Sequence, residues 1–253
     1  MSEEARRSLT IGVDLGQRAD YTAIAVAEGW RQPRPLQEGA QQLRAESHFV
    51  VRSLERLDLG TNYLAVAQRL RQVVAQVRLR SGHDALAVYV DATGVGVPVL
   101  DVLRQVQLRA ALMPVWFTST DRLVEVREQP KGLGAPKGRV IELRCGKAHL
   151  VSRLQALLQG RQLHLPRALP SAAAVREEML AYEIRASQDG GDTFGAFNAG
   201  SHDDLVTAIG LAVLREPASN LASLSRTMGE LRATSPRSGM GDVLAGGSWP
   251  RSW

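Results

Sequence analysis

The sequence predicts an α/β protein with a central mixed sheet, in which an antiparallel three-strand start is followed by parallel strands and helices flank the sheet. Three observations support this fold class. Short apolar runs occupy residues 9–13, 22–27 and 47–57, and residues that favour turns and loops separate them. Apolar residues at helical spacing follow over 63–80. Beyond them, strand-like and helix-like stretches alternate, as parallel strands joined by helical crossovers require.

The first two runs predict a hairpin whose turn begins at an aspartate. The first run breaks at Asp14, which Leu and Gly16 follow, and "TAIAVA" then resumes the strand pattern. Residues 30–42 are rich in Pro, Gln and Arg and predict a loop before the third strand.

A buried strand, a helix and another strand come next. "ALAVYVDA" is apolar without alternation, which is typical of a strand covered on both faces, and its strand pattern ends at Asp91. Two glycines then precede a helix expected over 98–110, with Pro98 in its first turn. "LMPVWFTST" predicts the following strand, so a parallel crossover is expected here.

A basic hairpin is predicted at about residues 121–145. "LVEVREQ" and "GRVIELR" alternate apolar and polar residues around the Lys-, Gly- and Pro-rich "PKGLGAPKG". Basic side chains on such a tip can follow a phosphate backbone without reading bases, although a solvated loop would look the same. The candidate DNA-binding residues are Arg127, Lys131, Lys137, Arg139 and Arg144.

The last third of the chain predicts further helices and strands and then a tail. We expect a domain over 1–217 and a disordered tail over 218–253, where Ser, Gly, Arg and Pro replace the periodic pattern. Within the domain we expect helices at 147–159, 171–180 and 203–214, a strand at 161–166, and a hairpin that pairs 182–187 with 193–198.

Composition narrows the function classes. The 253 residues include 31 Lys and Arg against 26 Asp and Glu, so the net charge of +5 favours a polyanionic partner. Cys145 is the only cysteine, which excludes a disulfide framework or a cysteine metal cluster and makes the cytoplasm the expected compartment. The polar start does not resemble a signal peptide, and no apolar run reaches the ~20 residues of a membrane span, so we expect no membrane partner.

Four aspartates occur where several elements can bring them together. Asp14 and Asp91 end strand-like runs, whereas Asp203 and Asp204 open a helix-like run. Carboxylates that converge in this way suit a hard divalent cation such as Mg²⁺ or Mn²⁺ rather than Zn²⁺. Each residue alone also fits a structural role, as a turn aspartate or as a helix N-cap.

The motifs "GVDLGQRADYTAIAV", "YVDATGVGVPVLDVL", "KAHLVSRLQALLQGRQLHLP" and "HDDLVTAIGLAV" together resemble the nuclease domain of the large terminase subunit of tailed phages, which has an RNase H-like fold. The resemblance covers roughly residues 9–215. It implies an endonuclease that uses two Mg²⁺ or Mn²⁺ ions to cut double-stranded DNA during viral genome packaging in the host cytoplasm. It also implies a packaging ATPase, a portal and a small terminase subunit as partners.

The same resemblance assigns roles to residues of this chain. Asp14, Asp91 and Asp204 would be the principal metal ligands, and Asp203 an adjacent ligand or a neighbour of one. Lys147 would lie near the site and bind DNA, although an ordinary surface lysine fits equally well. From its position before the acids, His202 could assist proton transfer or contact a phosphate, although a partly exposed structural histidine is the favoured interpretation.

One departure from the family and three further functions remain to be considered. The Gly-x-x-x-x-Gly-Lys-Ser/Thr loop of a packaging ATPase is absent from the sequence, which fits an isolated nuclease domain, a separately expressed nuclease or a relic. A Holliday-junction resolvase-like nuclease would share the fold. An actin- or sugar-kinase-like ATP-binding protein also begins with a "GxDxG" hairpin but needs a second, matching hairpin. A non-catalytic DNA-binding subunit would not need the four acids.

Overall fold

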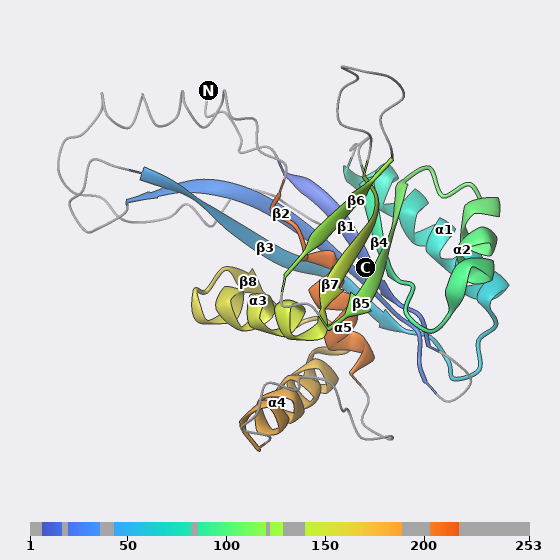
Figure 1. Ribbon diagram of the computed structural model, residues 1–253. Coiled ribbons are helices and arrows are strands. Elements are labelled where there is room, and N and C mark those ends of the chain that lie inside the picture. Colours follow the sequence, from blue (N-terminus) through green and yellow to red (C-terminus); the bar gives the residue numbers. More distant parts are fainter. Residues whose placement is uncertain are drawn as a thin grey trace.

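An eight-stranded mixed sheet forms the centre of the molecule, with strand order β6-β7-β5-β4-β1-β2-β3-β8 (Figure 1). The computed structural model describes residues 7–16, 20–35, 43–81, 86–119, 122–128, 140–188 and 203–217.

The strands that carry the first acids form the middle of this sheet. β1 runs antiparallel to β2, and β2 runs antiparallel to β3, whereas β4 pairs parallel with β1 and β5 pairs parallel with β4. An antiparallel meander extended by parallel strands beyond β1 is the arrangement of the RNase H-like fold, so the predicted fold class is confirmed. The bounds are β1 Ser8–Asp14, β2 Ala23–Pro35, β3 Leu43–Arg56, β4 Leu86–Asp91 and β5 Ala111–Thr118.

Three shorter strands complete the sheet at its edges. β7 (Val140–Gly146) pairs parallel with β5, and β6 (Val124–Arg127) pairs antiparallel with β7. The two flanks of the expected hairpin therefore pair as predicted, and its tip lies outside the described residues. At the opposite edge, β8 (Leu163–His164) pairs parallel with β3.

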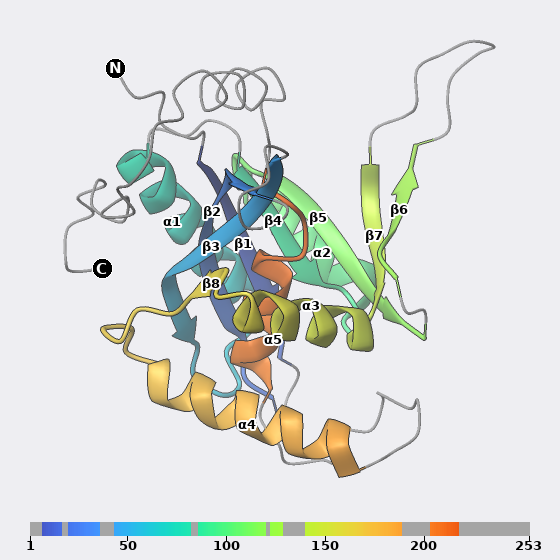
Figure 2. The ribbon, with the colours of Figure 1, turned by 90° about the vertical axis from the view of Figure 1, so that its left-hand side faces the viewer.

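Helices cover both faces of the sheet (Figures 1 and 2). α1 (Tyr63–Ser81) and α2 (Gly96–Gln105) pack on one face, and α3 (Lys147–Gln159) and α5 (Asp204–Ala212) pack on the other. α4 (Ala172–Gln188) lies outside α5, farther from the sheet. None of the described helices has the length and apolar character that crossing a membrane requires.

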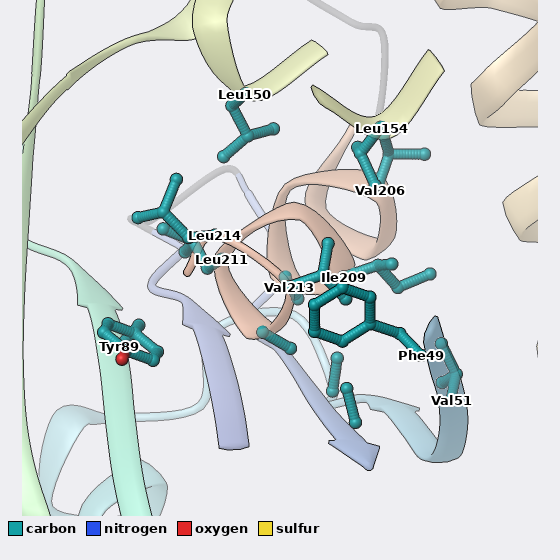
Figure 3. Packing of buried hydrophobic residues seen from close by; sticks show 14 of the residues in the cluster. Phe49, Val51, Tyr89, Leu150, Leu154, Val206, Ile209, Leu211, Val213 and Leu214 are labelled. Carbon is teal, nitrogen blue, oxygen red and sulfur yellow. The ribbon is translucent and has the colours of Figure 1, made fainter. Parts of the chain in front are cut away.

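α5 lies between the sheet and its outer helices, which explains its composition. All nine of its residues are buried, and an apolar surface all round is what a helix enclosed on every side needs. Figure 3 shows Val206 and Ile209 of α5 between Leu154 of α3 and Phe49 of β3. The first helix turn, which carries Asp204, is thereby fixed against the sheet.

Two expectations for the β2–β3 region and the α2–β5 connection were wrong. β2 continues to Pro35 and β3 begins at Leu43, where we expected a loop over 30–42. Among the described residues, β1 pairs with β2 only as far as Gly29 and the end of β2 pairs with β3, so the missing N–H of a proline costs little there. α2 ends at Gln105 rather than near 110, because the following residues turn back to start β5.

The expected strand at residues 182–187 was also wrong. These residues continue α4, which runs to Gln188. "YEIRAS" contains aromatic and β-branched residues that favour strands locally, but the sequence offers no helix breaker before Gly190. Its proposed partner, residues 193–198, lies outside the described residues.

Candidate metal centre

Asp14 and Asp91 are the last residues of two adjacent parallel strands. Val13 of β1 pairs with Val90 of β4, so the two aspartates follow side by side at the same edge of the sheet. Both residues are partly exposed, whereas the valines before them are fully buried. The apolar runs therefore end where the carboxylates meet solvent.

α5 brings the other two aspartates to this edge because it runs antiparallel to β1. A Cβ atom on Gly12 would lie 2.0 Å from the carbonyl oxygen of Ala208, so a glycine is required where strand and helix touch. Farther along, the hydroxyl of Thr10 donates a hydrogen bond of 2.6 Å to the carbonyl of Ala212. The start of α5 consequently faces the end of β1, beside Asp14.

The pKa shifts of the strand aspartates show that the four acids lie within electrostatic reach of one another. Burial raises the pKa of Asp14 well above its ordinary value, and the charges of Asp91, Asp203 and Asp204 raise it further. Burial also raises the pKa of Asp91, and the charge of Asp203 adds to that effect. A nearby cation would relieve this repulsion, and Lys147 does so in part, since its charge lowers both pKa values.

Asp203 and Lys147 form an ion pair beside these carboxylates. Lys147 opens α3 directly after β7, and its Nζ lies 3.7 Å from Oδ2 of Asp203. The same Nζ lies 5.7 Å from the ring centroid of Phe117 on β5. Asp203 is the N-cap residue of α5 and is partly exposed. Lys147 therefore lies close to the aspartates.

Asp204 is turned away from this ion pair and toward β3. Arg56, the last residue of β3, donates from Nε to Oδ2 of Asp204 at 2.7 Å and from Nη2 to Oδ1 at 3.1 Å. Both carboxylate oxygens are thus engaged by one guanidinium, and Asp204 is buried. The neighbouring acids of "HDDL" consequently have different surroundings.

Glu178 of α4 completes the network around Arg56. Its carboxylate forms an ion pair with Arg56 and accepts a hydrogen bond of 3.1 Å from the backbone N–H of Val206. Burial raises the pKa of Glu178 to about 7, against the lowering effects of that N–H and of Arg56. Strand β3, helix α4 and the first turn of α5 are therefore tied together at one guanidinium.

The loop after Asp91 is held by a threonine. Oδ1 of Asp91 accepts a hydrogen bond of 2.7 Å from the backbone N–H of Thr93, and Oγ1 of Thr93 accepts one of 2.7 Å from the N–H of Phe117. Gly94 and Gly96 have φ of 85° and 72°, which other residues adopt at a cost. The turn is therefore specified by its glycines.

The donor chemistry fits a hard divalent cation, although the carboxylates are not drawn together as ligands. Within the described parts of the chain, no three Asp, Glu, His or Cys side chains stand close enough to hold a metal ion as they lie. Asp14, Asp91 and Asp203 nevertheless have the features of a Mg²⁺ or Mn²⁺ site before the ion binds. They offer only oxygen donors, they repel one another, and they are partly exposed. Binding would require the carboxylates of Asp14, Asp91 and Asp203 to rotate toward one another.

The remaining predicted site residues fall into two groups. Arg127 of β6 and Arg144 of β7 are exposed and form ion pairs with Glu125 and Glu142, their near neighbours on the same strands. Four others lie outside the described residues, namely Lys131, Lys137, Arg139 and His202.

Arg56 and Glu178 are the residues of this region that sequence reasoning missed. Arg56 lies 148 positions from Asp204, and Glu178 lies 28 positions from Val206. No local pattern marks either of them, since a charged residue at a strand end or on a helix is ordinarily solvated. Their role in holding the start of α5 becomes visible only in the structure, where the Asp204 carboxylate is buried against Arg56.

Comparison with known proteins identifies solved structures of similar fold. The large terminase nuclease from thermophilic phage G20c shares 19% identity over 85% of this chain and 86% of its own, with a TM-score of 0.46. The human cytomegalovirus terminase nuclease domain shares 14% identity over 88% of both chains, with a TM-score of 0.46. A yeast mitochondrial Holliday junction resolvase shares 10% identity over 89% of this chain and 82% of its own, with a TM-score of 0.33. No family model and no curated protein matches the sequence.

Proposed function

We propose that this protein is a metal-dependent endonuclease that cuts double-stranded DNA, as a terminase nuclease does during viral genome packaging. One observation carries the proposal: Asp14 and Asp91 end adjacent parallel strands, and α5 brings Asp203 within electrostatic reach of both. Three carboxylates at a sheet edge, beside a lysine, suit phosphodiester hydrolysis better than a purely structural role.

We propose that Asp14, Asp91 and Asp203 would hold the Mg²⁺ or Mn²⁺ ions. This revises the assignment implied by the resemblance, in which Asp204 was a principal ligand. Both oxygens of Asp204 are engaged by Arg56, whereas Asp203 raises the pKa of both strand aspartates. When bound, the ions would supply an activated water and stabilise the leaving 3′ oxygen.

The protein's own residues then have distinct tasks. Lys147 presents a positive charge beside the carboxylates, where it can hold a phosphate oxygen of the DNA. Arg56 and Glu178 fix Asp204 and the start of α5, so that the backbone of Asp203 keeps its position near the strand ends. The turn at Gly94, which carries no side chain, leaves room for a DNA backbone beside Asp91.

We propose that the β6–β7 hairpin contacts the DNA through phosphates. Arg127 and Arg144 are exposed on its strands, and their pairs with neighbouring glutamates are weak enough to exchange for phosphate. Lys131, Lys137 and Arg139 belong to its basic tip sequence, and Lys147 follows β7 directly. Phosphate contacts carry no base information, so cutting would be sequence-nonspecific, with site choice left to a packaging ATPase, portal or small terminase subunit.

Cleavage of supercoiled plasmid tests this function. The wild type and Asp91→Ala are compared in Mn²⁺, in Mg²⁺ and in EDTA. Asp101→Ala is the matched control, because Asp101 is exposed on α2 and pairs with the nearby Arg104. We expect metal-dependent nicking and linearisation that Asp91→Ala abolishes and Asp101→Ala retains. Absence of cleavage by a folded wild type in every metal, or equal loss in both variants, would reject the assignment. A four-way junction cut far faster than linear duplex would point to a resolvase instead.

A further inference from the structure

A groove at the opposite end of the molecule from the aspartates combines arginines with apolar side chains. It has a volume of about 830 Å³ and lies between the C-terminal ends of α1 and α2. β4 starts at this end of the sheet and reaches the aspartates only after its six residues, which separates groove and carboxylates by about 20 Å. The groove is therefore a separate surface and does not depend on the proposed nuclease activity.

The rim of the groove is cationic. Arg71 and Arg78 come from α1 and Arg109 from the loop after α2, and among the described residues that line it none is acidic. The guanidinium of Arg78 donates a hydrogen bond of 3.1 Å to the carbonyl of Arg109, which joins the two walls. Three glutamines add neutral hydrogen-bonding groups. Such a rim favours an anionic ligand.

The interior of the groove is apolar, and one large apolar side chain in it stands in solvent. Leu79 is 87% exposed, although it lies on a helix whose other face is part of the core. Val74 and Leu108 are buried and also line the groove. An apolar groove edged by an exposed leucine and rimmed by charged residues is the kind of surface that a partner can cover.

The loop that forms the second wall adopts a costly conformation. Gln107 and Arg109 have φ of 50° and 52°, in the left-handed region that residues with a Cβ seldom adopt. Both side chains are exposed and line the groove, whereas Leu108 between them is buried. The strained loop thus places Arg109 on the rim and a leucine in the floor.

We propose that this groove binds an acidic amphipathic segment of a protein partner, such as a helix with leucines on one face and glutamates beside them. The apolar side chains of the segment would cover Leu79 and the floor, and its carboxylates would pair with Arg71, Arg78 and Arg109. DNA fits the groove less well, because a phosphate backbone has nothing to place on an exposed leucine and an apolar floor.

Fluorescence polarisation with the full chain tests the groove. The ligand is a labelled helical peptide of about 15 residues with a leucine face flanked by glutamates, and a second peptide carries glutamine in place of each glutamate. We expect Arg71→Glu/Arg109→Glu to weaken binding of the acidic peptide at least about tenfold and Leu79→Ser about fivefold or more. Arg167→Glu, which reverses an exposed charge outside the groove, should leave binding within about twofold.

The remaining outcomes decide against the proposal. If the wild type does not bind the acidic peptide, or binds the glutamine peptide equally well, no acidic ligand is selected there. Equal losses in Arg71→Glu/Arg109→Glu and Arg167→Glu would indicate attraction by net charge alone. If the groove variants instead weaken binding of a DNA duplex, the surface belongs to nucleic acid. Plasmid cleavage by the groove variants should stay at the wild-type rate, which keeps this test separate from that of the nuclease.

Discussion

Arg56 at the end of β3 engages both carboxylate oxygens of Asp204 at the start of α5, at 2.7 and 3.1 Å. Two residues that are far apart in the chain thereby fix a helix start against the sheet, and two neighbouring aspartates acquire different surroundings. Asp203 remains beside Asp14, Asp91 and Lys147, whereas Asp204 is buried in an ion-pair network. The predictions below begin from this difference.

Replacing the two neighbouring aspartates should separate activity from stability. Asp203→Asn should lower plasmid cleavage more than about 100-fold and change the free energy of unfolding by less than ~0.5 kcal/mol. Asp204→Asn should lower cleavage about 10- to 100-fold and destabilise the fold by about 1–3 kcal/mol, because Arg56 loses a charged partner. Cleavage rates and urea unfolding measure both effects. A larger loss of cleavage in Asp204→Asn than in Asp203→Asn would indicate that Asp204, and not Asp203, is the metal ligand.

Removing the guanidinium at the centre of the network should destabilise the protein strongly. Arg56→Ala leaves the carboxylates of Asp204 and Glu178 buried without their common partner, so we expect a loss of about 3–5 kcal/mol in urea unfolding at pH 7. Arg69→Ala is the matched control, because Arg69 pairs with Glu55 at a more exposed site and should cost about 0–1 kcal/mol. If both variants lose a similar free energy of unfolding, the network around Arg56 does not stabilise the fold as proposed.

The repulsion among the carboxylates predicts how metal and pH act on stability. Because the pKa of Asp14 is raised in the folded state, its contribution to stability is present below the ordinary value of 3.8 and is lost as the pH rises through the raised pKa. Asp14→Asn should therefore raise the melting temperature of the metal-free protein at neutral pH. Mn²⁺ should raise the melting temperature of the wild type and should not change that of Asp14→Asn.

Differential scanning fluorimetry without DNA measures these melting temperatures. Asp101→Asn provides the matched control, since this exposed aspartate of α2 pairs with the nearby Arg104. A metal-free Asp14→Asn variant that melts below the wild type would show that the Asp14 carboxylate stabilises the fold and contradict the prediction.

The contact between β1 and α5 leaves no room for a side chain at Gly12. Gly12→Ala places a Cβ atom 2.0 Å from the Ala208 carbonyl and 2.4 Å from the Ala212 nitrogen, so α5 must shift, at a cost of about 1–3 kcal/mol. Cleavage should fall as well, because the shift moves Asp203 relative to Asp14. Gly60→Ala, with nothing within 4 Å and φ of +80°, should cost only the backbone penalty of about 1 kcal/mol and keep full activity.

Charge reversal at the hairpin tip tests the DNA contact. Lys131→Glu/Lys137→Glu should weaken binding of a DNA duplex about tenfold or more and flatten the dependence of the dissociation constant on salt. Arg167→Glu serves as the control for net charge, since this exposed arginine follows β8. Fluorescence anisotropy over a salt series compares the tip variant with this control. An unchanged salt slope in the tip variant would show that the hairpin tip does not contact DNA.

The sequence alone determined the antiparallel start of the sheet, the parallel crossover that follows it, and the strand ends at which two of the aspartates lie. Asp14 and Asp91 could be placed because each ends an uninterrupted apolar run, and parallel strands bring such ends to one edge. Local patterns failed where local preference and context disagreed. The end of β2 contains two prolines and still forms a strand because one of its edges is unpaired, and residues 182–187 are helical because α4 continues through them.

Only the tertiary structure decided which of two adjacent acids joins Asp14 and Asp91. In "HDDL" the two aspartates are equivalent to any local rule, since both precede a helix and both could cap it. Their roles separate because Arg56 reaches Asp204 from β3 while Lys147 reaches Asp203 from α3. These partners lie far apart in the chain and meet only when both elements pack around α5, so no short-range pattern records the choice.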